Sequence, residues 1–456
     1  MFESFDRLLK GLHPAYMVIL SYLSAALIGM FLLSLPQASS GDPLHPLDAL
    51  FTATSAICVT GLIVVDTGSQ FTLFGKTVIL ILIQMGGLGV MTFSVFLFLF
   101  LGRKIGTRER WIINDTFTAA PTGDIAKLIR MIFIFTFVLE GAGAVVLFIV
   151  FMRRGGMMVG EALFSGIFHS VSAFCNAGFS FFSNSFIAYR ENVALNVAVM
   201  ILIVMGGIGF PVIYEIAERL KKKRKRKRKM MSLHSRMVLS STAVLIISGA
   251  VILFLFEGGA AFSQLSMKGR VLTSFFQSIT ARTAGFNTID ISSLKPAALM
   301  ILIMLMFVGA SPGSCGGGIK TTALAVFAGI VRSRIRGLRH DSFGKRTIPD
   351  EIVSRVFSIF ILAIVTVSIG LLLLLLTQKP GNTQFFYLAY LFEAVSAFAT
   401  VGLSVGVTSA LTWAGKLVII ALMLMGRVGL LTIAYVLTRK KRKITYKYAE
   451  EKVMIG

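Results

Sequence analysis

Long apolar stretches, almost free of charge, dominate the pattern of hydrophobic and polar positions along this chain. They cover residues 15–35, 78–101, 131–152, 195–214, 238–256, 297–308, 356–376 and 417–437. Most of them reach the roughly 20 residues that a helix needs to cross a bilayer. Soluble helices alternate polar and apolar faces, which these stretches do not, so the pattern disfavours a large soluble core. The sequence therefore predicts eight transmembrane helices.

Between these stretches one short motif occurs four times. Its copies are residues 51–61 (FTATSAICVTG), 168–178 (FHSVSAFCNAG), 275–285 (FFQSITARTAG) and 392–402 (FEAVSAFATVG). Each copy has Phe ten residues before its final Gly, and three have Ser six residues before it, whereas the third has Ile279 there and shifts its Ser to Ser278. The final Gly residues are 117, 107 and 117 positions apart. Self-similarity on this scale predicts four equivalent elements around a common axis.

The motif gives the expected organisation. Its four copies begin in the middle segments 46–58, 161–175, 270–282 and 384–399 and end in the turns just after them; these segments are too short to span a membrane and are expected to be re-entrant pore helices. The fold class predicted is an all-α membrane protein with four tandem helix–pore-helix–helix repeats around one central pore. We expect the repeats at residues 1–110, 111–229, 230–346 (with a broken second helix) and 347–456, the last including a C-terminal cytoplasmic tail.

The positive charge supports this topology. The formal net charge is +24, and most of the 45 Lys and Arg residues lie in the segments 1–14, 103–130, 218–236, 332–355 and 439–456. By the positive-inside rule these segments and both termini are cytoplasmic, which predicts a multi-pass protein of the cytoplasmic membrane. The basic run 221–229 is also compatible with a nuclear signal or a nucleic-acid-binding arm. A cytoplasmic loop that touches anionic membrane lipids fits this setting better, so we expect no nucleic-acid partner.

The residues that follow each pore helix are the candidate chemistry. Gly at the end of an extended turn lets successive backbone carbonyls point inward, and rings of carbonyl oxygens replace the hydration shell of a potassium ion. No Asp or Glu lies in these turns, so we expect selection by backbone rather than by carboxylates. A single such Gly would only indicate a tight turn, but four in register favour a filter. The candidate potassium filter is Val59, Thr60 and Gly61; Asn176, Ala177 and Gly178; Thr283, Ala284 and Gly285; and Thr400, Val401 and Gly402.

The second helix of the third repeat contains five Gly and one Pro within ten residues. Gly and Pro each destabilise a helix interior, so we expect this helix to break into two halves around a loop below the filter. Close helix packing through small residues is the alternative. The loop is Gly309, Ala310, Ser311, Pro312, Gly313, Ser314, Cys315, Gly316, Gly317 and Gly318.

Arg427 is the second unusual feature, because an Arg at membrane depth is costly and usually faces a cavity or a partner. It lies 25 residues after Gly402, which predicts a depth close to the loop. Three roles stay open: a barrier to cations, an anchor for the loop through backbone carbonyls, or a structural ion pair.

Several other polar residues receive structural interpretations. Arg282 is expected to brace the end of its pore helix, and Lys320 to cap a half-helix or to reach the cytoplasmic vestibule. His169 and Glu393 hold matching pore-helix positions and are expected to make local hydrogen bonds, whereas no partner can be named for Glu140. Cys58, Cys175 and Cys315 make neither a disulfide framework nor a metal site. The Gly motifs lie in apolar helices rather than after strands, so this chain is expected to bind no nucleotide.

The four turns, together with the Gly-rich segments 85–89, 205–209, 309–318 and 425–429, carry a resemblance that covers essentially the whole chain. The chain resembles the membrane subunits of the Trk/Ktr/HKT superfamily of potassium transporters, and most closely the Ktr branch (KtrB/KtrD-like). Trk-type relatives carry extra N-terminal membrane helices, whereas here one helix precedes the first turn. Gly61 is retained where sodium-selective plant relatives have Ser, which implies potassium selectivity.

The resemblance implies potassium uptake through the filter, with the loop 309–318 as the gate. It further implies a homodimer on a cytoplasmic KtrA/KtrC-like regulatory ring that binds ATP or ADP, docked on the basic segments 103–110, 219–229, 332–346 and 439–447. No cofactor is expected; potassium is the transported ion, and sodium is a candidate coupling or activating ion. Channel-like flow and sodium-coupled uptake stay open. The competing class, a membrane enzyme or lipid-handling protein, would need convergent His, Asp or Glu side chains, which five scattered His residues do not supply.

Overall fold

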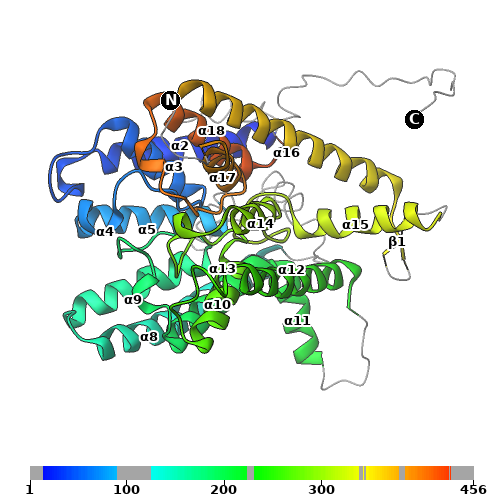
Figure 1. Cartoon of the computed structure of the whole chain (residues 1–456), viewed down its shortest axis with the longest axis horizontal. Helices are drawn as coiled ribbons and strands as arrows, with labels where there is room; N and C mark the ends of the chain where they lie inside the picture. The colour runs from blue at the N-terminus through cyan, green and yellow to red at the C-terminus, as the bar shows by residue number, and fades with distance from the viewer. Residues whose placement is uncertain are drawn as a thin grey trace.

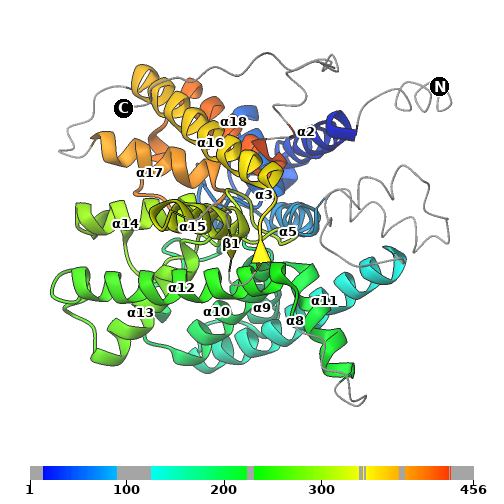
Figure 2. The same cartoon turned by 90° about the vertical axis from the view of Figure 1, so that its right-hand side faces the viewer.

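The computed structural model describes residues 14–89, 125–222, 231–337, 342–343, 346–378, 386–430 and 432. These residues are mainly helical, and the sheet they contain is one short antiparallel pair, β1 (Ser342–Phe343) with β2 (Arg346–Thr347). The predicted all-α class is confirmed. Figures 1 and 2 show helices packed in several directions around the middle of the molecule, with α11 and α15 projecting at one end.

A long helix, a short helix and a second long helix follow one another four times along the chain. The first set is α2 (Pro14–Leu33), α3 (Pro46–Ile57) and α5 (Leu73–Leu88); the second is α8 (Ile125–Arg154), α9 (Val159–Phe174) and α10 (Val193–Ile208); the third is α12 (Leu233–Glu257), α13 (Met267–Thr280) and α14 (Pro296–Phe307); the fourth is α16 (Asp350–Thr377), α17 (Phe386–Phe398) and α18 (Trp413–Val428). We call these sets units 1 to 4. The remaining helices are α4 (Thr67–Gln70), α11 (Phe210–Lys222), α15 (Thr321–Ile335) and the 3₁₀ turns η1 (Pro36–Ala38), η2 (Ile187–Tyr189), η3 (Ile291–Ser293) and η4 (Thr408–Ala410).

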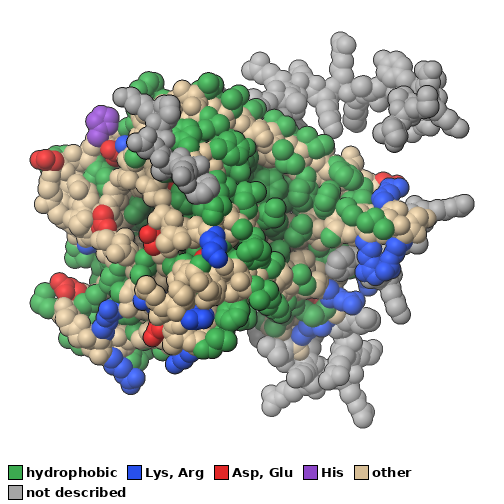
Figure 3. Space-filling model, viewed as in Figure 1, with side chains coloured by type: hydrophobic (Ala, Val, Ile, Leu, Met, Phe, Trp, Pro, Cys, Tyr) green, Lys and Arg blue, Asp and Glu red, His purple; other side chains and the backbone are tan. Residues whose placement is uncertain are grey.

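The first helix of each unit is long and apolar enough to cross a membrane. Large apolar side chains on these helices face outward; Phe31 is 64% exposed, and Leu255 and Leu376 are each 72% exposed. Figure 3 shows hydrophobic side chains over much of the face in view, with Lys and Arg side chains both at the end where α11 and α15 project and on the opposite half. An apolar outer surface of this kind is suited to lipid contact, so the chain is a multi-pass membrane protein.

The second helices are shorter than the sequence predicts, because each is interrupted at or near a Gly. Gly89, Gly209 and Gly429 have φ of 83°, 97° and 94°, which a right-handed helix cannot continue. The predicted stretch 195–214 is therefore divided between α10 and α11, which are bent by 97° relative to each other. Within the described ranges four helices reach spanning length, or five if this bent pair counts as one, so the total of eight stays a prediction. The predicted continuation over 90–101 lies outside the described residues.

The units pack in a closed cyclic order. The second helix of each unit packs on the short helix of the next: α5 on α9, α10 on α13, α14 on α17 and α18 on α3. Polar contacts near the helix starts reinforce two of these junctions. Lys416 Nζ lies 2.5 Å from Asp48 Oδ1, and Ser266 Oγ donates to Glu191 Oε1 at 3.2 Å. The order places the four short helices around one central axis.

The third short helix differs from the sequence alignment by one residue. The motif Phe of units 1, 2 and 4 is fully buried, but in unit 3 the buried ring is Phe276, while Phe275 is 37% exposed. In the same way, Thr280 rather than Ser278 is equivalent to Ser55, Ser172 and Ser396. In every unit the backbone carbonyl of this residue accepts a hydrogen bond from the backbone N–H of the residue before the filter Gly. That residue is four positions after Thr280 in unit 3, but five positions after the Ser in each of the other units. The turn in unit 3 is therefore one residue shorter.

Candidate ion-conduction site

Each short helix ends four or five positions before its filter Gly. The backbone then enters the left-handed region, with positive φ, which non-Gly residues rarely adopt. The residue two positions before each filter Gly has a positive φ: 57° at Val59, 60° at Asn176, 78° at Thr283 and 51° at Thr400. Such residues cost about 1–3 kcal/mol each and persist only where the surroundings over-determine them, often at functional sites. The same strained conformation in all four turns marks them as one structural feature.

A buried hydroxyl of the short helix holds each turn. Ser55 Oγ donates to Leu62 O at 2.7 Å and accepts from Gly61 N at 3.1 Å. The equivalent bonds run from Ser172 Oγ to Phe179 O at 2.9 Å and from Thr280 Oγ1 to Phe286 O at 2.7 Å, while Ser396 Oγ accepts from Gly402 N at 3.1 Å. The recurrent Ser of the motif is thus explained as a clamp across the filter Gly.

The four filter Gly residues form a closed ring. A Cβ added to Gly61 would lie 3.0 Å from Gly178 Cα, one on Gly178 3.0 Å from Gly285 Cα, one on Gly285 3.3 Å from Gly402 Cα, and one on Gly402 2.9 Å from Gly61 Cα. Each of these positions also points at the carbonyl oxygen that precedes the next Gly, on Ala177, Ala284, Val401 and Thr60 in turn. With φ between 70° and 91° as well, these positions need Gly for both space and conformation.

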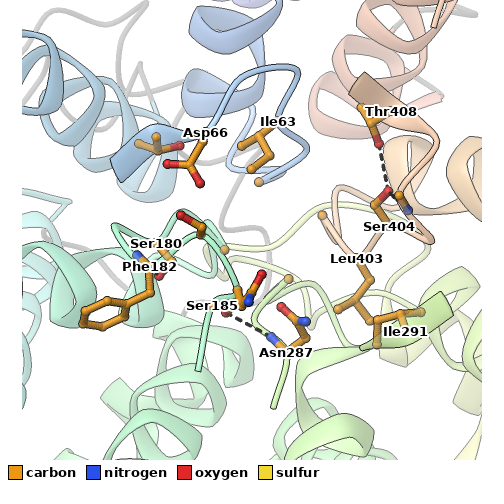
Figure 4. Close-up of a pocket in the computed structure, with 18 of the residues that line it drawn as sticks. Ile63, Asp66, Ser180, Phe182, Ser185, Asn287, Ile291, Leu403, Ser404 and Thr408 are labelled. Carbon is orange, nitrogen blue, oxygen red and sulfur yellow. Dashed lines mark hydrogen bonds between the residues drawn. The ribbon is translucent and has the colours of Figure 1, made fainter. Parts of the chain in front are cut away.

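A cavity of about 480 Å³ opens on one side of this ring, and all four filter Gly residues line it. Hydroxyl, amide and carboxylate groups from the segments after the turns form its walls, among them Asp66, Ser185, Asn287 and Ser404 (Figure 4). Burial favours a raised pKa for the Asp66 carboxyl, but hydrogen bonds from Ser183 and Ser69 outweigh it and hold that pKa below its usual value. The walls are therefore rich in oxygen atoms, which suits a hydrated cation.

On the other side of the ring lies the Gly-rich segment 309–318. The helix breaks here as predicted: α14 ends at Phe307, α15 begins at Thr321, and the segment between them forms a loop closed by a parallel bridge between Val308 and Ile319. Gly317 N donates to Thr400 Oγ1 at 3.0 Å, and a Cβ added to Gly316 would collide with Thr283 Oγ1. The loop therefore contacts the side chains of two of the strained filter residues directly.

The loop is held by the Gly motifs of other units. Ser311 N donates to Gly207 O at 3.0 Å, and Cys315 N donates to Gly206 O at 3.1 Å. Gly313 O accepts from Phe210 N at 2.8 Å, at the bend between α10 and α11. These bonds lie at helix ends, where backbone groups have no partner within the helix. The loop thus supplies the hydrogen bonds that the interrupted second helix of unit 2 lacks.

Arg427, on α18, contacts the same loop. Its guanidinium donates one hydrogen bond to the carbonyl oxygen of Cys315 in the loop and another to the carbonyl oxygen of Gly86 at the end of α5. No acidic side chain pairs with it in the described part of the chain. These contacts place the guanidinium between the loop and α5, and they place a positive charge beside the loop.

The other polar residues singled out from the sequence lie close to the ring or the loop. Arg282 donates to Thr242 Oγ1 on α12 at 3.4 Å, in agreement with a bracing role. Lys320 is the N-cap residue of α15, and its Nζ donates to Gly316 O at 2.8 Å, so it stabilises the loop itself. Glu140 accepts from Gln84 Nε2 at 3.2 Å and lies 3.8 Å from Cys175 Sγ, partners that the sequence did not suggest.

Cys58, Cys175 and Cys315 are free thiols. In the described ranges no group of three or more His, Cys, Asp or Glu side chains could hold a metal ion. The polar groups at the ring and the cavity are backbone carbonyls, hydroxyls, amides and the carboxylate of Asp66, an oxygen-rich set suited to cation binding.

Sequence reasoning missed two features of the site. The one-residue shift in unit 3 was signalled by Thr280, a hydroxyl residue beside the expected position, and by the second Phe of the pair 275–276. The bend at Gly209 was signalled by Pro211, because Pro is favoured in the first turn of a new helix and disfavoured in the middle of one.

The fold and the ring define a membrane cation-transport protein, and comparison with known proteins supports this class. Residues 15–444 match the model of the TrkH family, described as cation transport proteins. This chain belongs to that family. The crystal structure of the potassium transporter TrkH from Vibrio parahaemolyticus has the same fold, with a TM-score of 0.73 over 93% of this chain and 84% of that one, at 19% identity.

Curated relatives match over nearly the full length. The chain is 35% identical to the Ktr system potassium uptake protein B of Bacillus subtilis (strain 168), over 99% of both chains. It is 37% identical to the potassium/sodium uptake protein NtpJ of Enterococcus hirae and 35% identical to the Ktr system potassium uptake protein D of Bacillus subtilis, again over 99% of each chain. The similarity to Ktr proteins B and D confirms the branch predicted from the sequence, and these relatives are named as uptake proteins rather than enzymes.

Proposed function

We propose that this chain is the pore-forming subunit of a potassium uptake system. The observation that carries the proposal is the closed ring of four Gly turns, with the oxygen-lined cavity on one side of it. Uptake proteins that match over the whole chain support it. The four turns, 59–61, 176–178, 283–285 and 400–402, then act as the selectivity filter.

The electrostatics of the four short helices support a cation in the ring. Each helix carries a partial negative charge at its C-terminal end, and each ends directly before a filter turn. The carbonyls of Thr60, Ala177, Ala284 and Val401 adjoin the neighbouring Gly residues around the ring. Carbonyl oxygens so arranged can replace the hydration shell of potassium without a carboxylate.

We infer that the loop 309–318 is the gate and that Arg427 anchors it. The loop contacts Thr283 and Thr400 directly below the ring, and Arg427 ties it to α5 through the carbonyl of Gly86. Hydrogen bonds to charged groups contribute about 1.5–3 kcal/mol each, so the two bonds made by Arg427 can bias the loop strongly toward its docked position. In that position the loop lies across the ion path.

We further propose that cytoplasmic control comes from a nucleotide-binding KtrA/KtrC-like ring and that the chain forms a homodimer. The names of the Ktr-system relatives support a multi-component system. The segments 103–110 and 439–447 lie outside the described residues, as do residues 223–229 and parts of 332–346. The same proposal keeps both termini cytoplasmic and divides the chain at residues 110, 229 and 346.

Sodium is the second candidate substrate, favoured by the potassium/sodium uptake protein among the relatives. Retention of Gly at all four ring positions favours potassium over sodium. Sodium as a coupling or activating ion is compatible with the same ring.

Flux measurements in proteoliposomes test the proposal. Purified chain should carry potassium down a gradient, sodium should compete poorly, and a nucleotide-binding partner should change the flux with ATP or ADP. A protein without ion flux, with dimerisation and helical content intact, would refute the pore. Flux that does not respond to the partner over a concentration series would refute the regulatory part alone.

A further inference from the structure

One position of the four short helices is polar and buried in every unit. It lies three residues before the clamp hydroxyl and directly after the buried Phe. Its occupants are Thr52, His169, Gln277 and Glu393, with exposed fractions of 2%, 0%, 1% and 0%. Burying a polar group without partners is unfavourable, so each occupant calls for a structural account.

In unit 2, His169 holds the segment that leaves the filter. Its Nδ1 lies 2.8 Å from the carbonyl oxygen of Ser165, which can only accept, so Nδ1 carries the proton and Nε2 is free to accept. Nε2 accepts from Ser180 Oγ at 3.0 Å and from Phe181 N at 3.3 Å. These donors are two and three residues after Gly178.

In unit 4, Glu393 makes the same connection with different chemistry. Its Oε1 accepts from Ser404 Oγ at 2.5 Å and from Val405 N at 3.3 Å, which are two and three residues after Gly402. Its Oε2 accepts from Thr408 Oγ1 at 2.8 Å. An imidazole and a carboxylate therefore bind the same two positions beyond the filter.

Units 1 and 3 lack this connection. Thr52 Oγ1 has no hydrogen-bond partner among the described residues, and neither have the two amide atoms of Gln277. Thr288, three residues after Gly285, also has an unpartnered hydroxyl. Units 2 and 4 lie opposite each other in the cyclic order, so the ring is braced across one diagonal.

We propose that His169 and Glu393 are positioning residues that determine ion selectivity by fixing the outer ends of two opposite filter turns. Ser180 and Ser404, which they bind, line the cavity above the ring. A carbonyl ring discriminates between ions of different size only if its oxygens resist movement toward the smaller ion. Bracing one diagonal restricts that movement, while the unbraced turns of units 1 and 3 keep some freedom. The inference rests on the proposed potassium uptake.

The test compares variants that keep or remove the acceptor. His169→Phe removes Nε2 but suits the surrounding rings of Phe151, Phe182 and Phe186, whose centroids lie 5.0–5.7 Å from that of His169. Glu393→Met removes both oxygens at similar length. His169→Gln and Glu393→Gln retain an acceptor oxygen. Thr52→Val is the matched control, because it removes a hydroxyl without a described partner.

Potassium and sodium uptake are measured in proteoliposomes, with thermal unfolding as a check on the fold. We expect His169→Phe and Glu393→Met to lower potassium-over-sodium discrimination about tenfold, the equivalent of roughly one net hydrogen bond, while potassium flux persists. The Gln variants should recover most of the discrimination, and Thr52→Val should match the wild type.

Wild-type discrimination in both acceptor-free variants would overturn the inference. So would an equal loss in Thr52→Val, or a loss in the Gln variants as large as in the acceptor-free ones, because either would indicate a general packing role. If the acceptor-free variants do not fold, Ser180→Ala with Ser404→Ala removes the donors from the cavity side and must give the same loss. A wild-type chain without potassium flux would refute the proposed function instead.

Discussion

Replacing the filter Gly residues by Ser one at a time probes the ring most directly, and the structure predicts the order of the effects. An added Cβ meets the next unit's carbonyl oxygen most closely at Gly402, less closely at Gly61 and Gly285, and least closely at Gly178, where the separation is 2.8 Å. Because the obstacle is backbone, the turns themselves must move. We expect each change to admit sodium, in that order of severity.

The size of the selectivity loss depends on backbone conformation as well as on the steric contacts of the added Cβ. All four Gly residues have φ between 70° and 91°. A non-Gly residue held in that region costs about 1–3 kcal/mol. If the strained turn relaxes by shifting its carbonyls, the loss of discrimination is roughly 5- to 150-fold. Gly178→Ser should fall near the lower end of this range and Gly402→Ser near the upper end.

The assay is competition of sodium with potassium uptake, at matched expression. Gly156→Ser is the control, because Gly156 has φ of 86° but open space around it and lies on the loop between α8 and α9, outside the ring. It should lose some stability and no selectivity. Unchanged selectivity in all four ring variants would refute the filter assignment, and a larger effect at Gly178 than at Gly402 would refute the ring geometry.

Three further predictions concern the gate, the clamp and the cytoplasmic surface. Arg427→Ala, or removal of several residues from 309–318, should raise potassium flux at least tenfold and reduce its dependence on the regulatory partner. The reason is that the loop loses hydrogen bonds that contribute about 1.5–3 kcal/mol each. Flux that falls or stays constant in both variants would place the gate elsewhere. Thr280→Val should lower potassium-over-sodium discrimination several-fold in the uptake assay, because it removes the hydrogen bond to the segment after the filter Gly. Ser278→Ala loses only a bond to α12 and should lower thermal stability alone. Equal selectivity losses in the two variants would contradict the assignment of Thr280 as the clamp residue of unit 3. Neutralising 221–229 should weaken binding of anionic vesicles or of the partner in sedimentation assays and leave selectivity intact; changed selectivity would argue against a purely peripheral role.

Elements whose cause is local could be predicted from the amino-acid sequence alone. Apolar stretches of spanning length predicted the long helices, and the break of the third unit's second helix followed from the Gly and Pro residues of 309–318. The fourfold motif predicted the four turns, because each turn depends on its own short helix and its own Gly. Local patterns also singled out Arg427, since an uncompensated charge in an apolar stretch is visible without a structure.

Which groups meet, in contrast, depends on packing between segments that are distant in the sequence. The shift from Ser278 to Thr280 depends on which hydroxyl faces the filter turn, and a one-residue difference in turn length is set by packing against the neighbouring units. Two partners of Arg427 are the carbonyl oxygens of Cys315 and Gly86, more than a hundred residues away in sequence, and backbone acceptors leave no mark in side-chain identity. The equivalence of His169 and Glu393 is likewise not visible from their side-chain chemistry, which differs. It arises because the cyclic arrangement of the units gives them equivalent Ser donors on opposite sides of one ring.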